Sequence, residues 1–321
     1  MAAYSAQPEA PPENITATNL LDRLIKGDGV QLTPEQIGAF LAANHRSSES
    51  LLAASRASDD PAYLKEAKER FPDDPRVQYA AIFKSDSPEE RRQWLDRLKQ
   101  TAPDNALPDY LLALDDLKGG RSQQGVQELA DAVGKAGLQD YSLDFIQIAE
   151  EAYRSAGYSE VESKLIATSG LLLPQLAQFK QLSGQIVDLA NSYRQAGDTA
   201  SEQAVLQMAL HLGQQLDVGA NGGKFLINNL VGIAIQLNAL KVMDPASPYG
   251  DSGQTVQDYM DQITQHKAAI RQFAQQNEKL LPNMPPEDLI SFLDREKLYG
   301  EPAALQWYLN KSGQTSGTGP N

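Results

Sequence analysis

The sequence predicts an all-α fold made of short antiparallel helices, and three observations lead to this prediction. Ala and Leu occur about 40 times each among 321 residues, while aromatic residues make up only 7%. Straight-chain residues and alanine lose little side-chain freedom in a helix. Helix-start signals recur along the chain, and no segment alternates apolar and polar residues long enough to predict a strand.

Four helix-start signals of one kind divide the first third of the chain. Thr33-Pro34-Glu35-Gln36 has the spacing of a capping box, with proline in the first turn. Asp60-Pro61, Asp74-Pro75 and Ser87-Pro88 repeat the pairing of an N-cap residue with proline. Glycines then stand where helices should end, at Gly119-Gly120, Gly137, Gly157, Gly197 and Gly300.

The last third of the chain predicts longer helices separated by loops. A helix is expected over residues 225–243, between a loop at 218–224 and a Pro-, Gly- and Ser-rich loop at 244–253. Residues 255–281 predict one long, Gln-rich helix with a thin apolar stripe. This helix is expected either to pack along the preceding helices or to form a contact between subunits of an oligomer.

Composition excludes several classes of protein. The chain has no cysteine, which excludes disulfides and thiolate sites, and its net charge of −14 argues against nucleic-acid binding. Its three histidines are far apart, and no HExxH, GxSxG or P-loop pattern occurs. We therefore expect no metal, no cofactor and no catalytic residue set.

The ends of the chain and its hydropathy bear on localisation. Residues 1–14 lack the basic and apolar regions of a secretory signal and are expected to be disordered, like the Gly-, Ser- and Thr-rich residues 312–321. The longest apolar stretch, residues 230–240, is too short to span a bilayer. A cytoplasmic protein and a mature exported protein both remain open.

Two segments of the chain resemble each other. Tyr-Arg-x-Ala-Gly, followed five residues later by Glu, occurs once from Tyr153 to Glu162 and again from Tyr193 to Glu202. The offset is 40 residues, and a fixed offset of this size with helix–turn–helix content is typical of an α-solenoid. We expect one elongated domain over residues 15–311, with about eight helix pairs.

The repeated segment resembles a tetratricopeptide repeat (TPR). The matching residues are Leu189-Ala190, Tyr193, Gly197, Leu206 and Ala209. The resemblance covers residues 60–213 and, more faintly, 286–311. It implies a TPR-like fold in which antiparallel helix pairs stack into a superhelix. Glu162 and Glu202 stand where the family usually has a small residue, and this departure, together with the 40-residue offset, favours helices longer than usual.

The TPR resemblance also implies a binding site. In that family the first helix of each pair lines a concave groove, which here places Glu151, Arg154, Asn191 and Arg194 in the groove, flanked by Gln147 and Gln195. Two arginines one repeat apart can hold carboxylates or peptide carbonyls. The alternative is that Arg154 and Arg194 pair with neighbouring acids.

Residues 101–150 are the most acidic stretch, with nine acids against three bases. We expect a solvated face, or alternatively a docking face for a basic partner or a weak cation site. Upstream, the helix carrying Arg91, Arg92, Arg97 and Lys99 is interleaved with acids, which predicts ion pairs within that helix.

These observations favour a non-catalytic helical-repeat scaffold that binds a protein or peptide partner in its concave groove. Two alternatives remain. One is an all-helical enzyme, a hydrolase or lyase acting on a glycan or peptide, whose carboxylates, Asp115 and Asp116 among them, converge in a cleft. The other is a self-assembling structural subunit that uses residues 255–281.

Overall fold

The computed structural model describes residues 20, 23–24, 29–218, 225–250 and 253–313. The predictions for residues 1–14, the loop at 219–224 and most of the C-terminal tail lie outside these residues. Contacts group the chain into two compact units, and residues 15–311, predicted as a single domain, are divided between them. Each unit is described by itself.

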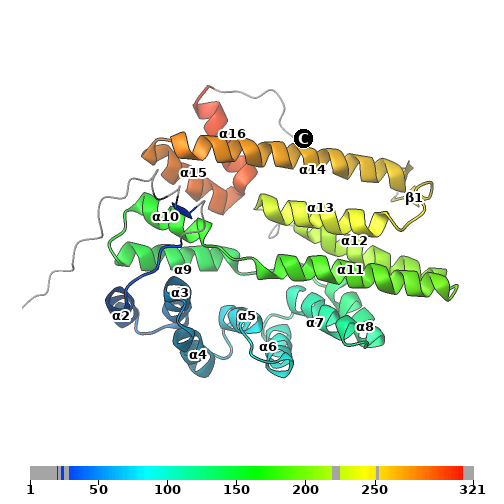
Figure 1. Ribbon diagram of the computed structural model, residues 1–321, viewed down its shortest axis with the longest axis horizontal. Coiled ribbons are helices and arrows are strands. Elements are labelled where there is room, and N and C mark those ends of the chain that lie inside the picture. Colours follow the sequence, from blue (N-terminus) through cyan, green and yellow to red (C-terminus); the bar gives the residue numbers. More distant parts are fainter. Residues whose placement is uncertain (1–19, 21–22, 25–28, 219–224, 251–252, 314–321) are drawn as a thin grey trace, which may run out of the picture. The chain divides into compact units, whose positions relative to one another are not determined.

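The described residues are almost entirely helical, as the sequence predicts (Figure 1). The only strands among them are β1 (Pro248–Tyr249) and β2 (Gln254–Thr255), which pair antiparallel across a turn. No helix in this part of the chain is both long and apolar enough to cross a membrane.

Unit 1 comprises Met1–Pro72, Ser142–Leu171 and Leu281–Leu293. Within it, α3 packs against α2, α4 and α9, and α9 packs against α10. Its elements are α2 (Pro34–Ala43), α3 (Ser48–Ser58), α4 (Pro61–Arg70), α9 (Ser142–Ser155), α10 (Glu160–Ser169), the 3-10 turn η1 (Leu281–Asn283) and the first part of α15 (Pro286–Tyr299).

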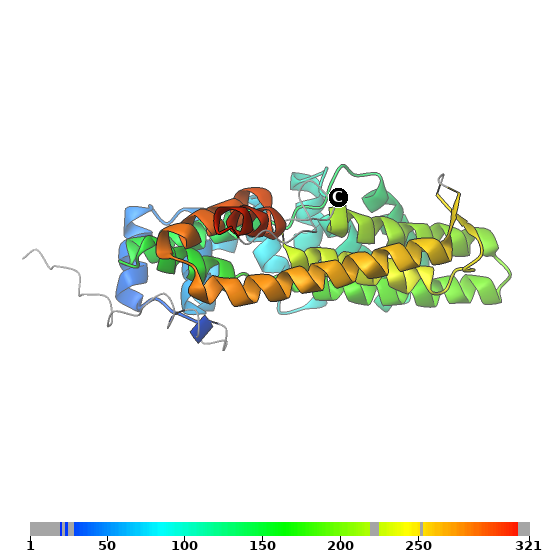
Figure 2. The same cartoon turned by 90° about the horizontal axis from the view of Figure 1, so that it is seen from above.

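Unit 2 comprises Asp73–Tyr141, Leu172–Leu280 and Asp294–Asn321. Its long helices α11, α12, α13 and α14 run side by side in both views (Figures 1 and 2). Besides the end of α15 and the two strands, its elements are α5 (Pro75–Phe83), α6 (Pro88–Thr101), α7 (Leu107–Lys118), α8 (Ser122–Val133), α11 (Pro174–Gln195), α12 (Thr199–Val218), α13 (Leu226–Leu240), α14 (Val256–Leu280) and α16 (Glu301–Lys311).

The predicted helix starts are confirmed at atomic detail. Thr33 and Gln36 form the complete capping box of α2. Asp60, Asp74 and Ser87 each accept a hydrogen bond from a backbone N–H in the first turn of α4, α5 and α6. These side chains satisfy donors that the first turn of a helix leaves without partners.

The repeated Tyr-Arg-x-Ala-Gly motif forms a helix end. In both copies the glycine has positive φ, +94° at Gly157 and +77° at Gly197. The residue after each glycine donates to the tyrosine carbonyl, and the glycine N–H donates to the arginine carbonyl. This is the Schellman hydrogen-bond pattern, so the motif specifies where a helix stops and the chain turns back.

The helices after these turns accommodate the two unusual glutamates in different ways. Glu162 completes a capping box with Ser159 at the start of α10, whereas Glu202 is 8% exposed and pairs with Arg194. The second pair, α11 and α12, has 22 and 20 residues, in line with the expectation of long helices, whereas the first pair, α9 and α10, has 14 and 10 residues and does not fit it.

The packing order of the helix pairs is not that of a regular array. Within unit 2, α7 packs on α11 and α8 approaches α12, although α9 and α10 lie between them in the sequence. In a regular solenoid each repeat contacts the next one along the chain. Within unit 1, α9 packs instead on α2 and α3.

Two helix backbones approach each other closely where α12 crosses α13. Gly213 and Gly232 face each other there, and a Cβ atom built on Gly213 would lie 2.7 Å from the carbonyl oxygen of Gly232. Such a distance is too short for any side chain. The two backbones therefore touch only because both residues are glycine.

We predict that Gly213→Ala lowers the free energy of unfolding by about 1–3 kcal/mol, because the added methyl group overpacks the crossing. Gly184→Ala in the middle of α11 is the matched control, since nothing lies within 4 Å of its Cβ position. The control should raise stability by about 0.5–1 kcal/mol. Urea unfolding followed by circular dichroism measures both, and equal effects would contradict the close crossing.

Candidate functional site

The first half of the predicted groove lies on α9 in unit 1. Gln147, Glu151 and Arg154 are all exposed there. The Gln147 amide donates to Glu151 at 2.6 Å, and the Arg154 guanidinium lies 3.9 Å from Glu160. The three side chains thus share one solvent-facing side of α9, with one weak ion pair.

The second half of the predicted groove lies on α11 in unit 2. Gln195 is exposed and Asn191 is half-buried, but Arg194 is held by neighbouring helices. Its Nε donates to Glu202 on α12 at 2.8 Å, and its Nη2 donates to the carbonyl of Val242, just after α13. Glu202 raises the pKa of this guanidinium. Arg194 therefore connects the end of α11 to α12 and to the residues that follow α13.

The groove prediction itself stays a prediction, because Arg154 and Arg194 belong to different units. Both arginines have an acidic neighbour, which is the alternative considered from the sequence. The tyrosine of the first copy packs inside the fold: the Tyr153 hydroxyl donates to the carbonyl of Val30 at 2.5 Å.

The bases of α6 pair with acids of α7, which corrects two expectations from the sequence. Arg91 binds Asp115 at 2.8 Å, and Arg92 binds Asp116 at 2.5 Å. The predicted ion pairs within α6 are wrong for these bases, and Asp116, fully buried, is no part of a solvated face. A buried carboxylate needs a cationic partner, and the helix that packs alongside supplies it.

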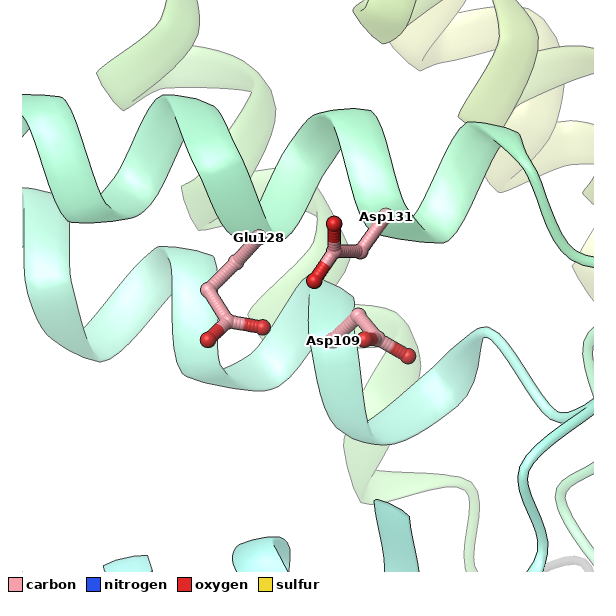
Figure 3. Close-up of side chains that lie close together, drawn as sticks. All are labelled: Asp109, Glu128 and Asp131. Atoms are coloured by element: carbon pink, nitrogen blue, oxygen red, sulfur yellow. The ribbon is translucent and has the colours of Figure 1, made fainter.

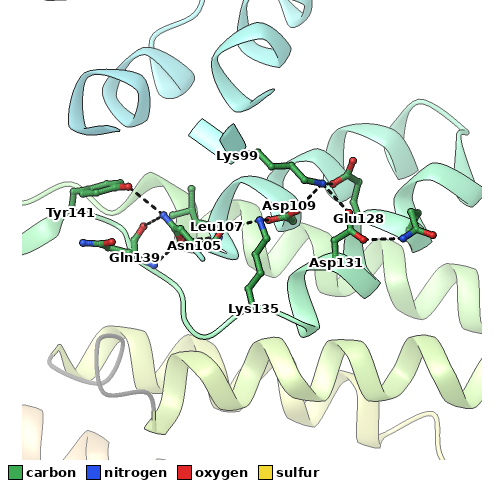
Figure 4. Close-up of polar contacts among 10 residues, drawn as sticks. Lys99, Asn105, Leu107, Asp109, Glu128, Asp131, Lys135, Gln139 and Tyr141 are labelled. Atoms are coloured by element: carbon green, nitrogen blue, oxygen red, sulfur yellow. Dashed lines mark hydrogen bonds and ion pairs between the residues drawn. The ribbon is translucent and has the colours of Figure 1, made fainter. Parts of the chain in front are cut away.

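Three further acids of the same stretch converge on one lysine. Asp109 on α7 and Glu128 and Asp131 on α8 bring carboxylate oxygens within 4.8 Å of one another (Figure 3). Lys99 reaches all three at 2.7–2.9 Å (Figure 4). Burial lowers the pKa of Lys99, but the bonds to the three carboxylates outweigh it and raise that pKa.

A second lysine completes this cluster. Lys135 binds the other oxygen of the fully buried Asp109 at 2.5 Å. The Lys99 ammonium group thus lies among the three carboxylates, where a metal ion would otherwise be held, while Lys135 pairs with Asp109 alone among them, and both charges offset the carboxylates. Next to them, the Asn105 side chain accepts from the backbone N–H groups of Leu107 and Gln139, fixing the start of α7 (Figure 4).

A chain of polar side chains links α12, α13 and α14. The Tyr259 hydroxyl donates to the Gln236 amide oxygen at 2.6 Å, and the Gln236 amide nitrogen lies 3.4 Å from Asp217. His266 Nε2 lies 3.6 Å from the same carboxylate. Burial raises the pKa of Asp217, while His266 and Gln236 oppose the shift. Tyr249 stacks on Tyr259, with ring centroids 4.3 Å apart.

Beside this network, a cavity of about 570 Å³ opens between α13 and α14. Nine residues line it, of which three are cationic and none is acidic: Lys241, Lys267 and Arg271. None of these three forms an ion pair with another described residue. Thr264 and two glutamine amides add neutral hydrogen-bond donors. Leu237 and Met260 form an apolar part of the cavity wall.

This arrangement favours an anionic ligand. Lys267 and Arg271 lie one turn apart on α14, and like charges at this spacing destabilise a helix by about 0.2–0.5 kcal/mol. A carboxylate between them would relieve the repulsion and could bind the Arg271 guanidinium in a bidentate manner. The cavity is thus the candidate functional site.

Sequence reasoning missed these three cations, although one signal was available. The positions three and four residues away from Lys267 and Arg271 hold no acid, so neither side chain is expected to form an ion pair within this helix. Lys241 lies in a different segment, and only the packing of α13 on α14 brings it to the same cavity.

No protein family, curated protein or solved structure matches this chain. The TPR resemblance therefore stays a prediction, and the cavity is interpreted from its own chemistry.

We predict that Asp109→Asn lowers the free energy of unfolding by about 3 kcal/mol, because it leaves two ammonium groups facing a buried neutral amide. Asp104→Asn, at an exposed position of the same stretch, is the control and should change stability by less than about 0.5 kcal/mol. Chemical denaturation measures both variants. Equal stability of Asp109→Asn and the wild type would show that the cluster does not hold α6 to α7 and α8.

Proposed function

We propose that this protein is a non-catalytic helical scaffold, of divergent TPR-like type, that binds a short acidic segment of a partner protein in the cavity between α13 and α14. The observation that carries the proposal is the convergence of Lys241, Lys267 and Arg271, without ion-pair partners among the described residues, in a chain of net charge −14.

The contrast with four cations between the helices α6, α7 and α8 supports this interpretation. Each of these cations forms an ion pair with an acid on a neighbouring helix: Arg91, Arg92, Lys99 and Lys135. The cations that line the cavity, in contrast, form no ion pair with another described residue. Charges that do not stabilise the folded chain are free to select a ligand, since complementary charge gives an interface specificity and a faster association rate.

The mixed lining favours a peptide over a bare ion. Leu237, Met260 and Ala268 give the cavity apolar wall beside the cations. An acidic segment with one apolar side chain would use both kinds of contact, and buried apolar anchors usually carry much of the binding energy. A long nucleic acid fits less well, because the overall negative charge repels it and three cations make only a small basic patch.

The paired helices support the scaffold part of the proposal. Two pairs end their first helix with the same Schellman turn, and helix pairs of this kind present side chains along one face. The proposal places the ligand on α13 and α14, outside the residues that the TPR resemblance marks as a groove.

We predict that the protein binds a fluorescein-labelled 12-residue peptide of Glu, Asp and Leu, measured by fluorescence anisotropy. A Gln/Asn/Leu analogue should bind at least about tenfold more weakly, because it lacks the charges that pair with the cavity cations. Rising salt should weaken binding of the acidic peptide, since salt screens exposed charges. The double variant Lys267→Glu with Arg271→Glu should lose at least about tenfold in affinity.

A charge-matched control separates the cavity from the overall charge. Lys84→Glu with Lys180→Glu alters the net charge equally at exposed positions of α11 and the end of α5, and it should keep the affinity of the wild type. A loss of the same size in both double variants would overturn the assignment to the cavity.

A further inference from the structure

A second unusual feature of unit 2 is a pair of carboxyl groups, one buried and one half-buried, where α15 meets α16. Glu296 lies in the last turn of α15 and is only 6% exposed. Glu301 is the first residue of α16, and its Oε2 accepts a hydrogen bond from the backbone N–H of Leu226, the first residue of α13, at 3.2 Å. Glu301 thereby connects the start of α16 to the start of α13.

Among the described residues, no cation forms an ion pair with either carboxyl. The charge of Glu301 bears on Glu296, and the start of α13 contributes the Leu226 N–H to Glu301. Two cations of these helices lie over an aromatic ring: Arg295 on α15 lies 4.6 Å and Lys311 on α16 lies 5.5 Å from the centroid of Trp307.

These surroundings disfavour two negative charges. Burial raises the pKa of Glu296 to about 8, and the charge of Glu301 adds to the shift. Burial also raises the pKa of Glu301, to about 7, against the opposing effect of the Leu226 N–H. The donor and the positive end of the α13 dipole favour placing the first negative charge on Glu301 and keeping the proton on Glu296.

We propose that Glu296 and Glu301 form a proton-dependent clamp, which holds the α15–α16 junction to the N-terminus of α13 while the pair carries a proton and loosens it when both carboxyls ionise.

The sign of the pH dependence follows from linkage. Both groups have a folded-state pKa above the ordinary glutamate value of 4.5. The clamp's contribution is therefore fully present below about pH 4.5 and is lost as pH rises through about 7 to 8. Within that window each proton released on opening raises the opening constant about tenfold per pH unit.

Hydrogen exchange on the full chain tests the clamp. After correction for the intrinsic exchange rate, the opening constant of amides in residues 294–311 should rise by about a hundredfold or more between pH 5.5 and pH 8.5. In Glu296→Gln, which imitates the protonated carboxyl, this rise should be clearly smaller because only Glu301 still titrates, and exchange at pH 8.5 should be slower than in the wild type.

Two further variants make the test specific. Glu301→Gln keeps an acceptor for the Leu226 N–H and should also flatten the pH dependence. Glu287→Gln removes one exposed carboxyl from the same helix and should retain the wild-type dependence. A wild-type opening constant that does not vary with pH, or a dependence that is undiminished in both Gln variants at the pair, would overturn the proposal.

Side-chain carboxyl NMR on the wild type provides a measurement that does not rely on a variant folding. The Cδ resonances of Glu296 and Glu301 should titrate with midpoints above about pH 6, against about 4.3 for ordinary glutamates. Ordinary midpoints for both residues would overturn the clamp. The result is independent of peptide binding to the cavity, so either proposal can fail alone.

Discussion

The contact on which unit 2 depends most is the crossing of α12 and α13 at Gly213 and Gly232. It brings two helix backbones together with no side chain between them. Next to this crossing, Gln236 on α13 comes close to Asp217 on α12, and the long helix α14 packs on the outer side of α13. The polar chain and the cation-lined cavity both lie where α13 meets α14, so both depend on where this crossing places α13.

Charged side chains in unit 2 fall into two groups. Some form ion pairs inside the fold, and others have no ion-pair partner among the described residues. Asp109 and Asp116 are fully buried, and cations of the adjoining helices neutralise them. Leaving such a carboxylate unpaired would cost several kcal/mol. Five acids of the most acidic stretch therefore take part in ion pairs with neighbouring helices: Asp109, Asp115, Asp116, Glu128 and Asp131. The cations around the cavity have no such partner among the described residues, and this difference makes them candidates for binding.

The sequence predicts those features that depend only on residues close to one another along the chain. The caps at Thr33, Asp60, Asp74 and Ser87 involve residues within three positions of one another, so the sequence alone contains them. The repeated Tyr-Arg-x-Ala-Gly motif was also informative, because it specifies a Schellman turn. The partners of Arg91 and Lys99 were not predictable, since they depend on how α6 packs on α7 and α8. The cavity escaped prediction for the same reason: Lys241 is 26 residues from Lys267 in the sequence.

The two ends of α13 explain why the three cations of the cavity are not equivalent. Glu301 accepts from the N-terminal N–H of α13, where the helix dipole is positive. At the other end Lys241 is the C-cap residue, and Arg194 donates to the nearby Val242 carbonyl, so cations lie where the dipole is negative. The end of α13 thus partly compensates the charge of Lys241. Lys267 and Arg271 lie in the interior of α14, far from a helix end, and repel each other. In the proposed complex, an anionic ligand would therefore gain more from Lys267 and Arg271 than from Lys241.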